Sequence, residues 1–72
     1  MEYLPQVERL AQINAAGVLV LLGEPMRQER QAIVDTLVSL NVIELQNHVS
    51  KGGFRFLKEE YKAEYLDAFK NF

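Results

Sequence analysis

Four basic residues gather in the last third of the chain, between residues 51 and 62. Only two acidic residues, Glu59 and Glu60, accompany them there. Lysine and arginine neutralise phosphate charge, so this stretch has the chemistry of a local nucleic-acid contact. Exposed basic residues are also ordinary solvated surface, so the cluster indicates phosphate binding only if the fold presents it on one face. The four residues are Lys51, Arg55, Lys58 and Lys62.

Catalytic chemistry has few candidates. The chain has one histidine, His48, and no cysteine, which excludes a Cys–His pair, a disulfide and a thiolate metal site. His48 and Glu44 fall on one face of a predicted strand, but two ligands do not make a convincing metal site. Gly52 and Gly53 lack the Gly-x-x-x-x-Gly-Lys spacing of a phosphate loop. We therefore predict no enzyme activity, no cofactor and no metal.

The chain is short and slightly acidic. Its 72 residues are enough for one domain, residues 1–72, and 49% of them are hydrophobic, as in globular proteins. The net charge of −2 counts against nucleic-acid binding by the whole surface. No basic region precedes an apolar run at the N-terminus, and the longest apolar run is too short to span a membrane, so we expect a cytoplasmic protein. A chain this small without disulfides needs a well-packed core or oligomerisation, and we expect a homodimer.

Helical spacing predicts a first helix over residues 3–13, with Asn14 ending it and capping the next. The apolar stripe of this helix comprises Leu4, Val7, Leu10 and Ala11. Residues 15–22 are apolar all round, so periodicity does not decide between a buried strand, a buried helix and a continuation of the first helix. The helical neighbours on both sides favour a short helix.

A further helix is predicted over residues 26–40, with Pro25 in its first turn. We expect the following side chains to face inward: Met26, Ile33, Leu37 and Leu40. Asn41 is placed to end this helix in the left-handed conformation and to lead the chain directly into a strand.

A β-hairpin and a terminal helix complete the pattern. Ile43, Leu45 and Val49 share one strand face, and glycine supplies positive φ cheaply in the turn at residues 50–53. Phe54 and Phe56 then point to the face opposite that of Arg55 and Leu57. The last helix is predicted over residues 58–71. Its wide apolar stripe comprises Tyr61, Tyr65, Leu66, Phe69 and Phe72.

The expected fold is mainly α with a β-hairpin (α+β), and this order of elements resembles a winged helix-turn-helix domain. The stretch AIVDTLVSLNVIEL is similar to the end of the recognition helix in that family, with Asn41 at the turn and two aliphatic residues entering the first wing strand. Phe54 and Phe56 resemble the second wing strand. A following helix that dimerises resembles small regulators of the PadR and multiple-antibiotic-resistance types.

The resemblance implies that residues 26–40 enter the major groove of duplex DNA and that residues 42–57 form a basic wing. Arginine suits guanine edges and glutamine suits adenine edges. The base-reading candidates are Arg27, Gln28, Arg30 and Gln31. Lys51 at the wing tip and Arg55 would contact phosphate or the minor groove. Glu24, Glu29 and Asp35 flank or share the reading helix, and their charge opposes phosphate.

The alternative function is a protein–protein interaction module that acts as an adaptor or inhibitor of a partner protein. A terminal helix this rich in aromatic residues has more apolar surface than so small a core needs. Core packing is the competing explanation, and it is stronger for Tyr61 and Tyr65 than for Phe72. The candidate interface comprises Tyr61, Tyr65, Phe69 and Phe72.

Overall fold

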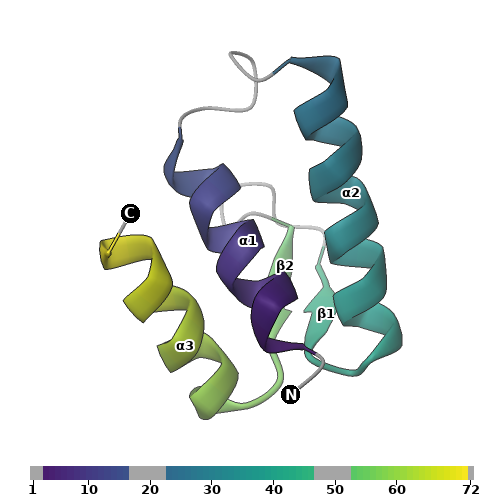
Figure 1. Ribbon diagram of the computed structural model, residues 1–72. Helices are drawn as coiled ribbons and strands as arrows, with labels where there is room; N and C mark the ends of the chain where they lie inside the picture. The colour runs from purple at the N-terminus through teal and green to yellow at the C-terminus, as the bar shows by residue number, and fades with distance from the viewer. Residues whose placement is uncertain (1–2, 17–22, 47–52, 72) are drawn as a thin grey trace.

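A computed structural model describes residues 3–16, 23–46 and 53–71 of the chain. These residues form three helices and one antiparallel pair of strands in the order α1 (Leu4–Ala15), α2 (Glu24–Ser39), β1 (Ile43–Leu45), β2 (Phe54–Phe56) and α3 (Glu59–Lys70). The α+β class expected from the sequence is confirmed. In Figure 1, α1 lies between α2 and α3, and the two strands pack beside them.

Helix α1 runs two residues further than its predicted end, so the prediction that Asn14 ends it is wrong. Pro5 occupies the first turn, where a missing backbone N–H costs nothing. The chain stays helical through Asn14 because Ala15 is a strong helix former, and the backbone N–H of Ala16 still bonds to Gln12 and Ile13. Ala15 therefore belongs to α1 and Ala16 is its C-cap, so the predicted separate helix does not begin at residue 15. Residues 17–22 of that prediction lie outside the described residues.

Helix α2 begins within two residues of its predicted start, with Pro25 in its first turn. It ends as predicted at Asn41, whose φ is 60°. The N–H of Asn41 bonds to the carbonyl of Val38, and the N–H of Val42 bonds to that of Leu37, which is the pattern of a Schellman motif. This motif directs the chain from Ser39, the last residue of α2, into β1 after only three residues.

The strand register is fixed by the pairs Ile43–Phe56, Glu44–Arg55 and Leu45–Phe54. A bond of 2.8 Å from the N–H of Gln46 to the carbonyl of Gly53 extends the ladder, and Gly53 has a φ of 80° as its place in a turn requires. Phe54 and Phe56 are half-buried while Arg55 and Leu57 are exposed, so the predicted alternation in the second strand is confirmed. The predicted continuation of the first strand to Val49 and the turn residues 50–52 lie outside the described residues.

The core lies where α1, α2 and the first strand meet. It comprises Val7, Leu10, Ala11, Ile13, Ile33, Val34, Leu37, Val42 and Ile43. Leu40 was expected to face inward but is 39% exposed, because it follows the last residue of α2 at the point where the chain turns away. Helix α3 contributes no fully buried residue, although it begins and ends within one residue of its predicted limits.

Candidate protein-interaction surface

The four residues predicted to read DNA differ in their exposure and in their hydrogen-bond partners. Arg27 and Gln28 are exposed on α2. Arg30 is half-buried, and its Nε donates a hydrogen bond of 2.9 Å to Asn14 Oδ1. Gln31 donates to Asp35 on the same helix at 3.0 Å. These four side chains therefore do not form one outward-facing set on α2.

The basic hairpin is also partly neutralised. Arg55 Nη2 forms an ion pair of 3.1 Å with Glu44 Oε2 across the two strands, at their directly opposed positions. Lys58 lies 4.0 Å from Glu60 and 5.5 Å from the centre of the Tyr61 ring. Lys51 and His48 lie outside the described residues. Among the three described members of the cluster, Arg55, Lys58 and Lys62, only Lys62 is exposed without a described acidic partner.

Arg30 belongs to a hydrogen-bonded chain that links the three helices. Asn14 Nδ2 donates to the Tyr65 hydroxyl at 2.9 Å, while Asn14 Oδ1 accepts from Arg30. The amide thus connects α2 to α3 through α1 and uses its donor and its acceptor together. Sequence reasoning missed this role because it treated Asn14 as a helix end. Arg30 is 16 positions from Asn14 and Tyr65 is 51 positions from it, so no local signal relates them.

A second pair joins α1 to α2. Arg9 donates from Nε and Nη2 to the two carboxylate oxygens of Glu29, each at 2.9 Å. This bidentate hydrogen bonding lowers the pKa of Glu29 and raises that of Arg9. The acid that the sequence analysis counted against phosphate binding is therefore engaged in holding the two helices together.

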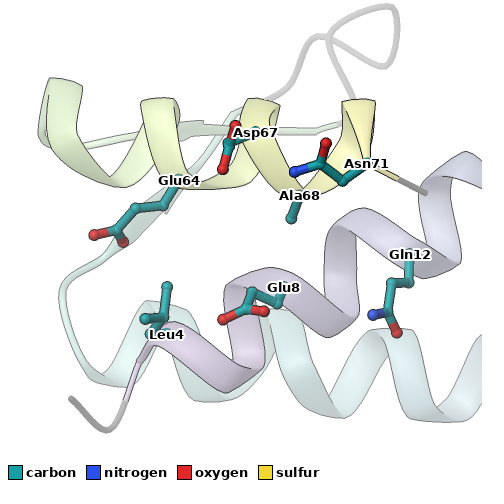
Figure 2. A pocket seen from close by; sticks show the side chains of 7 residues that line it. All are labelled: Leu4, Glu8, Gln12, Glu64, Asp67, Ala68 and Asn71. Carbon is teal, nitrogen blue, oxygen red and sulfur yellow. The ribbon is translucent and has the colours of Figure 1, made fainter.

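An acidic cleft of about 370 Å³ separates α1 from α3. Figure 2 shows the polar residues that line it: Glu8 and Gln12 come from α1, Glu64 and Asp67 come from α3, and Asn71 directly follows α3. Tyr3 donates to Glu64 Oε1 at 3.2 Å, and Glu64 Oε2 is buried without a described partner. Burial and then the bond to Glu64 raise the pKa of Tyr3. Within the described residues, no three histidine or acidic side chains are arranged to hold a metal ion.

The aromatic residues of α3 divide into inner and outer members. Tyr61 packs edge-on against Tyr3, with ring centres 4.7 Å apart, and Tyr65 lies 5.2 Å from Phe56. Both tyrosines are half-buried, so core packing accounts for them. Phe69 is 42% exposed and its neighbour Leu66 is 45% exposed. Phe72 lies outside the described residues.

Beside these two exposed residues lies the β2–α3 groove, with a volume of about 520 Å³. Its lining residues are Asn14, Phe54, Arg55, Phe56, Glu59, Lys62, Tyr65 and Leu66. Leu45, whose strand partner is Phe54, is 59% exposed. Singly exposed apolar residues are ordinary, but apolar side chains gathered along one groove are typical of an interaction site.

Comparison of the chain with protein-family models, with curated proteins and with solved structures yields no match. In the described part of the chain, no helix has the length and apolar character needed to cross a membrane.

Proposed function

We propose that this chain is a cytoplasmic protein–protein interaction module whose binding surface is the β2–α3 groove together with the outer side of α3. One observation carries the proposal: α3 has no fully buried residue, and Leu66 and Phe69 are both more than 40% exposed beside a groove that has both apolar and charged lining residues. Burying such side chains against a partner removes apolar surface from water, which is the dominant favourable term in protein association. The proposal includes no catalytic step and no cofactor.

We also propose that the fold is winged-helix-like. The Schellman ending of α2 at Asn41, the immediate entry into β1, the antiparallel return through β2 and the following helix α3 support this. In such an arrangement the strands would form the wing, and α2 would occupy the place of a recognition helix.

Site-specific photocrosslinking in cells tests the interaction proposal. A photoreactive phenylalanine analogue replaces Leu66 in one variant and Gln28 on α2 in a matched control, because both positions are exposed. We expect irradiation to join position 66, and not position 28, to a protein. Absence of a protein adduct at position 66, with full incorporation of the analogue, contradicts the proposal.

Duplex DNA binding is the second candidate, and the exposure of Arg27 and Gln28 on α2 favours it. Two electrostatic features oppose DNA binding. The charge of Arg55 is paired with that of Glu44. In addition, Glu24 and Asp35 lie on the same helix as the predicted base-reading residues and repel phosphate. Fluorescence anisotropy with a random-sequence duplex, from about 50 to 200 mM salt, separates the two candidates. DNA binding requires a steep loss of affinity with salt, and a flatter slope in the Lys51→Glu, Arg55→Glu double variant. Absence of binding at the low-salt end contradicts this candidate.

A further inference from the structure

The outer side of α3 carries a row of four exposed residues with the spacing of a coiled-coil seam. Glu59, Ala63, Leu66 and Lys70 follow one another at intervals of four, three and four residues. Such intervals keep side chains on one stripe of a helix over about three turns. We call this row the α3 seam. Its two central members are apolar, and its two ends carry opposite charges.

We propose that the partner of this surface is a second copy of the chain, with the two α3 helices packed antiparallel along the α3 seam. Antiparallel pairing about a two-fold axis places Leu66 of each copy over Ala63 of the other. It also places Glu59 of each copy beside Lys70 of the other. The small side chain of Ala63 lets the two backbones approach closely, and Leu66 fills the space above it.

Charge decides the direction of the pairing. A parallel pair would place Glu59 of one copy beside Glu59 of the other, and Lys70 beside Lys70. Like charges repel, so both contacts would be unfavourable. The antiparallel pair replaces these two repulsions with two Glu59–Lys70 attractions. It also aligns the two helix dipoles in opposite directions, which is favourable. Neither Glu59 nor Lys70 forms an ion pair with another described residue, so both charges are available at the seam.

The flank of the seam continues into the groove. Lys62 lines the groove, and Phe69 follows it two turns later on the same flank of the α3 seam. An antiparallel copy would bring Lys62 of one chain beside Phe69 of the other. A lysine over an aromatic ring is a favourable contact. The homodimer expected from the sequence therefore uses Leu66 and Phe69, while Tyr61 and Tyr65 serve α1 and β2. This inference rests on the proposed function, because it names the partner of that same surface.

Charge reversal tests the pairing directly. The mass in solution is measured by light scattering over a series from about 10 µM to about 1 mM, because so small an interface predicts weak association. We expect the unchanged chain to become dimeric along the series. Glu59→Lys alone and Lys70→Glu alone should each remain monomeric, because each places like charges together twice. The double variant should dimerise again, and an equimolar mixture of the two single variants should form a heterodimer.

Glu24→Lys is the matched control, because it makes the same charge change at an exposed position on α2, away from the α3 seam, and should leave the dimer intact. Thermal unfolding of each variant verifies that it is folded. A monomeric unchanged chain at every concentration overturns the proposal, as does failure of the double variant and the mixture to recover the dimer. If the chain is monomeric but position 66 crosslinks to a different protein, the second copy is overturned and the interaction module stands. Absence of both the dimer and the adduct overturns both.

Discussion

At the scale of single residues, Asn14 joins the three helices through its side-chain hydrogen bonds. Its amide accepts from Arg30 and donates to Tyr65, so removing it leaves two half-buried polar groups without these partners. Losing two such bonds costs about 1–3 kcal/mol. We expect Asn14→Ala to lower the free energy of unfolding by that amount, measured by urea denaturation. Tyr65→Phe removes one of the two bonds and should cost less; equal costs for the two variants would contradict this account.

The pair of Arg9 and Glu29 gives stability a pH dependence. Hydrogen bonding to Arg9 lowers the pKa of Glu29 in the folded chain, so folding favours the charged carboxylate. The contribution is present above the unfolded pKa of a glutamate, about 4.3, and is lost as the pH falls through the lower folded value. We expect the difference in melting temperature between the unchanged chain and Glu29→Gln to be constant from pH 7 to about pH 5 and to shrink below that. A difference that persists unchanged to low pH would contradict this linkage.

At the scale of elements, the junction between α2 and β1 depends on the left-handed conformation of Asn41. Glycine adopts a φ of 60° without strain. For residues that have a Cβ, apart from asparagine and aspartate, this conformation costs about 1 kcal/mol. We expect Asn41→Gly to retain or slightly raise the free energy of unfolding, and Asn41→Ala to lower it by about 1 kcal/mol. Chemical denaturation measures both. An equal loss in both variants would show that the asparagine side chain, and not its backbone conformation, holds the junction.

The elements were predictable wherever the signal was local. Asn41 ends α2 because the left-handed preference belongs to the residue itself, and the alternation of Phe54 and Arg55 is visible without knowledge of the fold. Asn14 was misread because its two partners come from distant parts of the chain. Leu40 continues the apolar spacing of α2 but lies past its last residue, so periodicity alone assigned it to the core.

The candidate site was predictable only in part, for the same reason. The sequence indicates an apolar stripe on the last helix, but it does not divide that stripe into the tyrosines that pack inward and the residues that remain exposed. That division depends on where Tyr3 and Phe56 lie, and both approach α3 from elements distant in sequence. Likewise, the basic residues were visible, but the pairing of Arg55 with Glu44 follows from the strand register.

At the scale of the whole molecule, apolar surface is distributed unevenly. The fully buried residues of the described chain come from α1, α2 and the segment that enters and begins β1, and α3 adds none. A chain of 72 residues buries only about 60% of the surface it exposes when unfolded, so its stability is marginal. Covering the outer side of α3 with a second copy adds apolar burial that the single chain lacks. In the proposed dimer, folding and association are therefore coupled.

That coupling makes thermal stability depend on protein concentration. A partner that binds only the folded chain raises the melting temperature by mass action, and each kcal/mol gained raises it by about 4–8 °C in a domain of this size. We expect the melting temperature of the unchanged chain to rise over a hundredfold increase in concentration, measured by calorimetry or circular dichroism. Leu66→Glu should abolish the rise, because it would bury a carboxylate against Ala63 of the second copy. It should leave the melting temperature at the dilute end nearly unchanged, since Leu66 is 45% exposed in the single chain. A rise of equal size in both proteins would place the association elsewhere on the molecule.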